Sequence, residues 1–217
     1  MDAPNVIPRL ILASASPRRK ALLREAGLSF AVIPSRVDET RVPLCEPAAY
    51  VRRLAEAKAG SVSAGHPESW VIGADTVVKV DDALLGKPAD RHAARRMIER
   101  LNGRSHDVLT GYAVQCRDQR VFFSDCVSTR VEFKQLTAAE ISWYADTGEP
   151  LHKAGGYAIQ GLGVFLVKRV DGSYTNVVGL PVCEILAFFI DKGLIGPLQD
   201  GRWQRKMMRG EHHGAEA

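Results

Sequence analysis

The chain has 217 residues, of which 46% are hydrophobic and 25% are charged, and its formal net charge is +4. This length suits one ordinary domain, or two lobes that share a sheet, and the composition excludes a disordered or fibrous protein. Basic and acidic residues are interspersed except at 202–209, where four residues are basic, so nucleic-acid binding is disfavoured.

Cysteine spacing and hydropathy indicate where the protein works. The four cysteines show neither a CxxC spacing nor a paired histidine, which disfavours a zinc site or a disulfide framework and favours reduced thiols. The N-terminus lacks a basic segment followed by an apolar one, and the apolar run 185–190 is too short to span a bilayer. We therefore expect a soluble cytoplasmic protein without membrane contact.

The first half of the chain predicts strands that alternate with helices. A helix should begin after the N-cap Ser16 and Pro17, and Gly27 suits its end. Asp90 is expected to cap a later amphipathic helix that ends at 102–103. The strands of this half are predicted over 9–14, 30–34, 70–80 and 84–85, and its helices over 17–27, 46–63 and 91–101.

The second half predicts an antiparallel hairpin, 108–116 with 121–133, joined by a polar turn. A helix over 137–146 opens with a capping box, and a glycine-rich segment, a strand and a closing helix follow over 153–163, 164–170 and 181–192. The fold class is α/β with a mixed sheet, in which ligands bind at strand carboxyl ends. Residues 1–193 form the domain, and 194–217 are expected to be a frayed, flexible tail.

One candidate anion site lies at the first junction between strand and helix. Ser14-Ala-Ser-Pro-Arg-Arg19 brings two hydroxyls, helix N-terminal amides and two guanidinium groups together. The positive end of a helix dipole favours an anion, and arginine can hold phosphate oxygens with two hydrogen bonds. The alternative is an ordinary capped helix with solvated arginines, and physical reasoning alone does not choose between them.

Two charged residues interrupt apolar patterns. Lys58 falls on the apolar stripe of its helix, where a buried ammonium needs an anionic partner, unless the lysine reaches solvent from the edge of the stripe. Asp75 lies in the apolar strand 70–80, beside Gly73, which allows a close approach. This aspartate must be paired or bind metal, or else cap a neighbouring helix. Asp38 and Glu39 could complete a site for Mg²⁺ or Mn²⁺.

Two further segments carry weaker signals. Lys87 lies in a stiff turn that lacks the P-loop pattern. The segment 153–163 offers Lys153, a flexible backbone and Gln160, but it also suits a plain bulged connection. The histidines, including His106 and His152, lack metal-ligand spacing and are interpreted as surface or core residues.

Together these segments resemble the Maf family of nucleotide pyrophosphatases over about 9–190. The blocks that carry the resemblance are LILASASPRRKALL, VDET, LAEAKA, VIGADTVV, LGKP, AARRMIERLNGRSHDVLTG, KAGGYAIQG and GSYTNVVGLPV. The resemblance implies an elongated mixed sheet with two lobes and a central cleft, often in a homodimer. It also implies hydrolysis of nucleoside triphosphates to a monophosphate and pyrophosphate with a divalent cation.

The resemblance also assigns roles to individual residues. Asp75 matches the catalytic base and, with Glu39, the metal site, while Arg18, Thr76 and Gln160 match positions linked to choice of dTTP and UTP. The remaining substrate-binding positions are Ser14, Arg19, Lys58, Lys87 and Lys153. The chain departs from the family pattern at His152, where an aspartate is common, so a role of that aspartate in binding metal or holding Lys153 must move elsewhere or weaken.

Three alternatives stay open at this point. A regulator of septum formation could bind nucleotide without turnover, a pyrophosphatase could act on 7-methyl-GTP, and the basic stretch 202–209 could bind nucleic acid. The last lacks interleaved aromatic residues. A pure binder has no reason to place an unpaired carboxylate such as Asp75 beside a polyanion.

Overall fold

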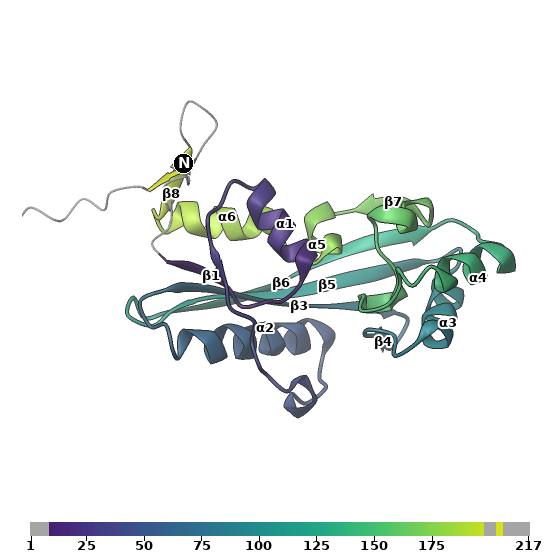
Figure 1. The fold of residues 1–217 in the computed structure, drawn as a ribbon, viewed down its shortest axis with the longest axis horizontal. Coiled ribbons are helices and arrows are strands. Elements are labelled where there is room, and N and C mark those ends of the chain that lie inside the picture. The colour runs from purple at the N-terminus through teal and green to yellow at the C-terminus, as the bar shows by residue number, and fades with distance from the viewer. Residues whose placement is uncertain (1–8, 198–202, 206–217) are drawn as a thin grey trace, which may run out of the picture.

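The computed structural model describes residues 9–197 and 203–205. A seven-stranded mixed sheet runs along the longest axis of the molecule (Figure 1). Its strands lie in the order β2-β1-β3-β5-β6-β7, and β4 pairs with β3. β1 is parallel to β2 and β3, whereas the later pairs are antiparallel. The bounds are β1 Leu10–Leu12, β2 Ala31–Val32, β3 Trp70–Val80, β4 Ala83–Leu85, β5 Ser105–Cys116, β6 Val121–Phe133 and β7 Val167–Asp171.

Helices cover both faces of this sheet. α2 lies along one face, α1, α5 and α6 lie on the other, and α3 and α4 pack at one end (Figure 1). The bounds are α1 Pro17–Glu25, α2 Pro47–Ser63, α3 Arg91–Leu101, α4 Ala138–Asp146, α5 Tyr174–Val178 and α6 Val182–Asp191. Three short 3₁₀ helices are η1 Glu39–Arg41, η2 Ala154–Gly156 and η3 Gly161–Phe165.

Two glycines let α2 lie directly on the sheet. A Cβ at Gly73 in β3 would collide with the backbone of Ala55, and one at Gly111 in β5 would collide with the backbone of Val51. The predicted close approach at Gly73 is therefore confirmed, and the approaching group is a helix backbone. This contact brings Lys58, one turn beyond Ala55, next to the middle of β3.

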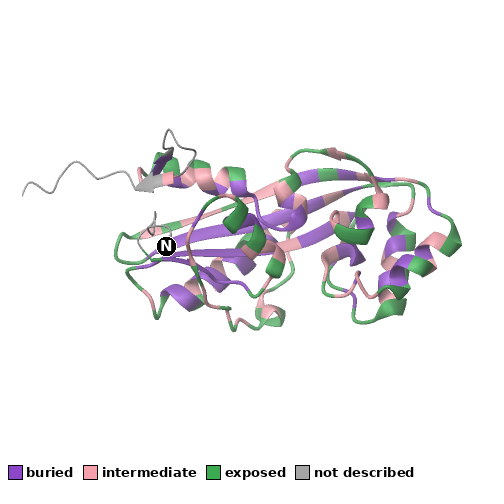
Figure 2. Ribbon diagram, turned by 45° about the horizontal axis from the view of Figure 1, so that its top comes forward, coloured by how far each residue is buried: buried purple, intermediate pink, exposed green. Residues whose placement is uncertain are grey.

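The apolar core divides into two lobes at the middle of the long strands. One large buried cluster includes Ala74 and Tyr112, and a second begins at Val78 and Val108. Thr76 of β3 and Thr110 of β5 lie opposite each other at the boundary between the two clusters. Figure 2 shows buried segments on both sides of this boundary. The predicted two-lobed, mixed α/β architecture is confirmed, and polar residues mark the junction of its lobes.

Most predicted elements are confirmed, but the strand predicted over 164–170 is wrong at its start. Residues Gly161–Phe165 form η3, and β7 begins only at Val167. Just before the predicted strand, the backbone N–H groups of Leu162 and Gly163 donate to the Glu149 carboxylate, at 2.9 and 2.8 Å. The Leu166 N–H then donates to the carbonyl of Gly163 at 3.1 Å, so the chain is still helical where the strand was expected to begin. The five-residue helix α5 was not predicted, because so short a segment shows no periodicity.

The structure also shows order inside the stretch for which a frayed tail was expected. β8 (Ile195–Pro197) pairs antiparallel with β9 (Trp203–Arg205). Ile195 is fully buried in the core of the first lobe, and the Trp203 indole donates to the carbonyl of Ala26 at 2.7 Å. The short sequences of β8 and β9 lie among glycine and charged residues and lack the apolar runs that made β1 and β4 predictable. The rest of the stretch, 198–202 and 206–217, lies outside the described residues.

Among the residues that the structure describes, no helix combines the length and the apolar character that a membrane span requires.

Candidate active site

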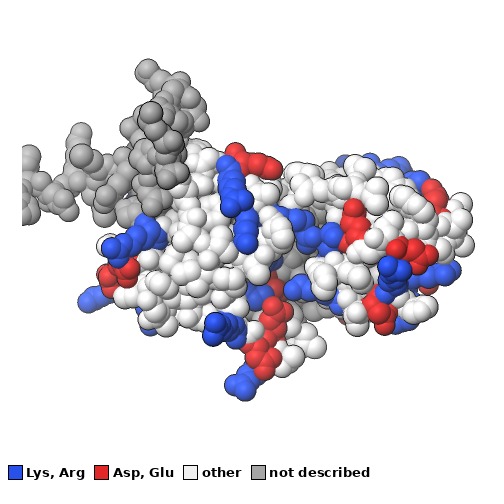
Figure 3. Space-filling model, in the orientation of Figure 1, with Lys and Arg blue, Asp and Glu red and all other residues white. Residues whose placement is uncertain are grey.

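A cavity of about 610 Å³ opens at the junction of the two lobes. Charged side chains of both signs gather around a hollow near the middle of the molecule (Figure 3). Ten of the side chains that the sequence analysis selected line the cavity. They are Ser14, Arg18, Arg19, Glu39, Lys58, Asp75, Thr76, Lys87, Lys153 and Gln160. Asp38 is not among the lining residues; its carboxylate instead accepts from the backbone and hydroxyl of Thr40 and caps η1.

The loop between β1 and α1 forms one wall of the cavity. The Ser14 hydroxyl accepts from the Ser16 backbone at 3.2 Å, and the Ser16 hydroxyl caps α1 by accepting from the Arg19 backbone at 3.5 Å. Pro17 stands at the first helical position, as predicted. The helix N-terminus thus lines the cavity, where the positive end of its dipole favours an anion.

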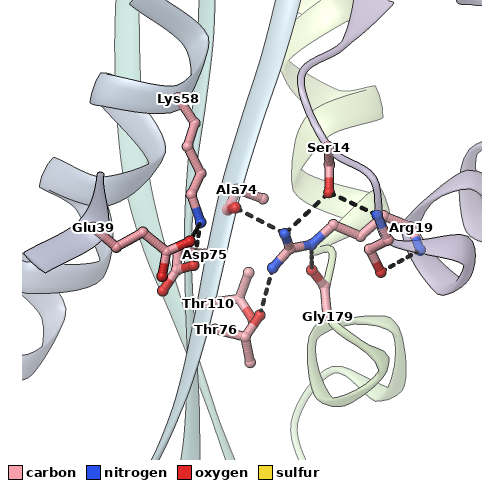
Figure 4. Close-up of polar contacts among 10 residues, drawn as sticks. Ser14, Arg19, Glu39, Lys58, Ala74, Asp75, Thr76, Thr110 and Gly179 are labelled. Carbon is pink, nitrogen blue, oxygen red and sulfur yellow. Dashed lines mark hydrogen bonds and ion pairs between the residues drawn. The ribbon is translucent and has the colours of Figure 1, made fainter. Parts of the chain in front are cut away.

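Arg19 is anchored by four protein acceptors (Figure 4). Its Nε donates to the carbonyl of Gly179 at 2.7 Å, and Nη1 donates to the carbonyl of Ala74 at 2.8 Å and the hydroxyl of Ser14 at 3.3 Å. Nη2 donates to Thr76 Oγ1 at 3.0 Å. Burial lowers the pKa of Arg19 from its ordinary value, against the attraction of Asp75. Of its five N–H groups, one has no partner among the described residues.

Thr76 continues this network into α5. Its hydroxyl lies 2.9 Å from that of Thr110, which donates to the backbone carbonyl of Asn176 at 3.2 Å. Each hydroxyl has one proton to donate. Arg19 therefore donates to Thr76, Thr76 donates to Thr110, and Thr110 donates to the carbonyl of Asn176. Thr76 therefore keeps only acceptor capacity for a ligand. Thr110 was not selected from the sequence, since a threonine in a strand has no distinguishing signal of its own; Thr76 was selected only through the family resemblance.

Lys58 joins two carboxylates on the other side of β3 (Figure 4). Its ammonium lies 2.6 Å from Asp75 Oδ1 and 2.7 Å from Glu39 Oε1. The side chains of Lys58 and Asp75 are 9% and 11% exposed, so the lysine does not reach bulk solvent from the edge of the stripe. The predicted burial of both charges is confirmed. One N–H of the ammonium has no acceptor within the described part of the chain.

The two carboxylates could hold a divalent cation. Each uses one oxygen for Lys58, and no described residue donates to the other oxygen. Mg²⁺ is commonly held by one or two carboxylates together with phosphates and water, so this pair fits such an ion once a phosphate is bound. Glu39 is partly buried, which opposes ionisation, yet the hydrogen bond and charge of Lys58, helped by Lys87 and Arg19, lower its pKa.

Three further cations complete the positive wall. Lys87 is exposed at the end of the β4 turn, Arg18 Nε donates to the carbonyl of Val178 at 3.3 Å, and the Lys153 ammonium donates to the carbonyl of Glu149. Burial, followed by repulsion from Arg18, lowers the pKa of Lys153. Five cationic side chains therefore line the cavity against two carboxylates, which suits a polyanion.

The segment 153–163 forms the opposite wall. Gly155 and Gly156 have φ of 69° and 71°, which explains the pair of glycines. The Gly155 N–H donates to the carbonyl of Gly86 at 3.0 Å, so this wall is tied to the turn that carries Lys87. Gln160 lines the cavity, and its amide makes no hydrogen bond to any described residue, so it is available to a ligand.

The two histidines near the cavity differ in setting. His152 lines the cavity, is exposed and has φ of 65°. His106 is buried, and its Nε2 lies 2.8 Å from the hydroxyl of Tyr157, which lines the cavity. Burial lowers the pKa of His106 to about 4, so it is neutral near pH 7. The interpretation of His106 as a core residue is confirmed.

Comparisons with known proteins agree with this picture. A family model described as Maf-like protein matches residues 9–191. The chain is 50% identical over 185 residues to the dTTP/UTP pyrophosphatase of Myxococcus xanthus, covering 85% of this chain and 93% of that protein. It is 48% identical over 178 residues to the one of Geobacter sulfurreducens, covering 82% and 93%. The structure of the Staphylococcus aureus Ham1 protein matches with a TM-score of 0.50 at 12% identity, covering 85% of this chain and all of that one, which supports the fold alone.

Proposed function

The chain belongs to the Maf-like protein family, and on that premise we propose that it is a nucleoside triphosphate pyrophosphatase that acts on dTTP and UTP. It is a hydrolase of the anhydride between the α- and β-phosphates, and its products are a nucleoside monophosphate and pyrophosphate. Relatives that bear the name dTTP/UTP pyrophosphatase, and of which this chain covers more than nine tenths, favour this function over a non-catalytic regulator or a 7-methyl-GTP pyrophosphatase.

The observation that carries the proposal is the arrangement of charge in the cavity. Phosphoryl transfer depends mainly on positioning and on neutralising the phosphate oxygens. Arg19 and Lys58 are already fixed by protein partners, and each keeps one N–H for a phosphate oxygen. Groups held in place before the substrate arrives need no reorganisation during the reaction, which is where such electrostatic stabilisation is strongest.

Asp75 is the proposed general base. Its Oδ1 is held by Lys58, and Oδ2 can orient a water molecule toward the α-phosphorus and accept its proton. The water oxygen forms the new bond to phosphorus, the bond to the bridging oxygen breaks, and the electron pair leaves with pyrophosphate. Arg19, Lys58 and Lys87 neutralise the charge that gathers on the leaving group.

A divalent cation, Mg²⁺ or Mn²⁺, is proposed to be held by Asp75 and Glu39 together with the phosphates. When bound, it would neutralise phosphate charge and polarise the reacting phosphoryl group. Neither carboxylate is buried out of reach, since both line the cavity. His152 occupies a left-handed position on the rim and is not needed for this pair.

The base of the nucleotide is proposed to meet Gln160, Thr76 and Arg18. The free amide of Gln160 can donate and accept, which suits the edge of a pyrimidine, while Thr76 offers only an acceptor. A site that pairs polar groups with one base rejects another base strongly, because its own buried groups are left unpaired. Pyrimidine preference follows from this pairing.

The test is pyrophosphate release from dTTP, UTP, ATP, GTP and 7-methyl-GTP, each measured with Mg²⁺ and with Mn²⁺. We expect dTTP and UTP to give the highest kcat/KM. A preference for GTP or 7-methyl-GTP would contradict the assignment of the base site, and binding without release of pyrophosphate would favour the regulator. Location in the cytoplasm and assembly as a homodimer stay predictions.

A further inference from the structure

Glu149 lies just outside the cavity and organises the wall that carries Gln160. Its carboxylate accepts three hydrogen bonds, from the backbone of Leu162 at 2.9 Å, from the backbone of Gly163 at 2.8 Å and from the hydroxyl of Tyr144 at 2.9 Å. Its own backbone carbonyl accepts from the Lys153 ammonium. Glu149 itself does not line the cavity, so it acts on a ligand only through these neighbours.

Tyr144 completes the arrangement from inside the second lobe. It is fully buried in α4, and its hydroxyl donates to Glu149 while it accepts from the backbone N–H of Ala158 at 3.1 Å. We call Glu149 and Tyr144 together the clamp. It holds the backbone at residue 158 on one side of Gln160 and at residues 162 and 163 on the other.

Two glycines show that the clamp requires close contact. A Cβ at Gly161 would lie 2.6 Å from the Glu149 carboxylate, and one at Gly163 would collide with the carbonyl oxygen of Ala158 and lie 2.6 Å from the Tyr144 hydroxyl. Gly161 also has φ of 69°, in the region that favours glycine. The segment is therefore shaped to bring its backbone onto the two clamp side chains, whereas Gln160 has no hydrogen bond of its own to fix it.

We propose that the clamp sets the nucleobase preference of the cavity, with Glu149 and Tyr144 as positioning residues that fix the backbone on both sides of Gln160. The inference rests on the proposed function, since it concerns which base that function accepts. A misplacement of a binding group by about 1 Å can cost about a hundredfold in rate, so the backbone at 158–163 must be held firmly. The side chains that hold it decide how well the Gln160 amide meets a pyrimidine edge.

Charge strengthens the clamp. Partial burial of the Glu149 carboxyl opposes its ionisation, but the N–H groups of Leu162 and Gly163 and the hydroxyl of Tyr144 lower its pKa below the ordinary value. An ionised acceptor makes stronger hydrogen bonds than a neutral one. A glutamine at this position would present an NH₂ group to backbone donors, and at least one of them would lose its partner.

The experiment compares Glu149→Gln and Tyr144→Phe with two matched controls. Glu140→Gln removes the carboxylate that closes the capping box of α4, and Tyr112→Phe removes the hydroxyl of a buried tyrosine in the other lobe. For every protein, the ratio of kcat/KM for dTTP to that for dGTP is measured by pyrophosphate release. The ratio of the dissociation constants for dTTP and dGTP is measured by calorimetry in the presence of Ca²⁺. Melting temperatures of all variants are recorded in parallel.

We expect both clamp variants to lower the ratio of kcat/KM for dTTP to that for dGTP about tenfold or more, because the polar groups of the site no longer pair well with the base. Both control variants should keep the wild-type ratio. Backbone amides of 158–163 should exchange hydrogen faster in the clamp variants without nucleotide. A melting temperature lowered as in Glu140→Gln, with the ratio within twofold of wild type, would show a merely structural role and overturn the proposal. If one clamp variant does not fold, the ratio measured in the other variant tests the proposal.

The two proposals can fail separately. If wild-type protein releases no pyrophosphate from dTTP, the proposed function fails, and the ratio of dissociation constants still tests the clamp. If wild-type protein prefers dTTP and the clamp variants keep that preference, the clamp fails and the function stands.

Discussion

Replacing Asp75 by asparagine tests the proposed base at the point where the structure is most specific. The change keeps the shape of the side chain and an oxygen that can accept from Lys58, which now lies 2.6 Å away. It removes the negative charge and the ability to take a proton from water. Lys58 retains Glu39, at 2.7 Å, so the ammonium does not become an isolated buried charge.

The expected magnitudes separate catalysis from stability. A positioned base contributes about two to four orders of magnitude, equivalent to about 3–5 kcal/mol of the activation barrier. Exchanging a charged hydrogen bond for a neutral one at a buried lysine that keeps a second partner should cost about 1–3 kcal/mol of unfolding free energy. Affinity for the triphosphate in the absence of a divalent cation should survive, because a negative charge that faces a polyanion is removed.

The assay is pyrophosphate release from dTTP together with calorimetric binding of a non-hydrolysable dTTP analogue. Asp107→Asn is the control, since Asp107 in β5 is also paired with a cation, Arg130 at 3.2 Å, but does not line the cavity. Turnover near the wild-type rate in Asp75→Asn would refute the assignment and move the search to Glu39. Loss of binding in parallel with turnover would indicate that Asp75 holds the cation needed for affinity.

Three further predictions concern stability. Lys58→Met leaves two carboxylates of the cavity without their cation, so we expect a loss of about 3–5 kcal/mol in urea denaturation; unchanged stability would contradict this. The pKa of His106 falls from 6.5 to about 4 on folding. Its contribution to stability should thus be complete above about pH 6.5 and decline by on the order of 3 kcal/mol as the pH falls to about 4. His106→Gln should flatten that decline in chemical denaturation across this range, and an unaltered slope would assign it to other groups. Ile195→Ala should lower the free energy of unfolding by about 2–5 kcal/mol. It should leave kcat/KM for dTTP unchanged well below the melting temperature, since Gly179 is the last residue that lines the cavity. Lost activity in folded protein would show that the C-terminal strands shape the site.

The fold was predictable where a periodic pattern runs long enough to be distinctive. The strand bounds of β3 and β6 and the capping box of α4 follow from apolar runs and from Thr137 and Glu140. Prediction from the sequence failed where the backbone forms its hydrogen bonds with residues from elsewhere in the fold instead of with local ones. Glu149, for example, accepts from the N–H groups of Leu162 and Gly163, at the end of the glycine-rich segment and just before the predicted strand 164–170, and nothing local signals this contact.

The candidate site was predictable in membership but not in connectivity. A lysine on an apolar stripe and an aspartate in an apolar strand are both costly unless they are partnered, and this cost is what made Lys58 and Asp75 visible. That they partner each other depends on the glycine contact that seats α2 on β3. The sequence analysis assigned Lys58 to substrate binding, whereas in the structure its ammonium is paired with the carboxylates of Glu39 and Asp75.

The alternation of side chains along β3 explains why one strand can supply both halves of the site. Successive residues of a strand point to opposite faces, so Asp75 turns toward Lys58 on α2 and Thr76 turns toward Arg19 on α1 (Figure 4). A slip of one residue in register would exchange the two and bury Asp75 against the arginine network. The long antiparallel pairing of β3 with β5, from Val71 opposite Gln115 to Lys79 opposite Asp107, prevents such a slip. The sheet therefore holds the proposed base and the anchored cations at fixed positions relative to each other before any substrate binds, as electrostatic catalysis requires.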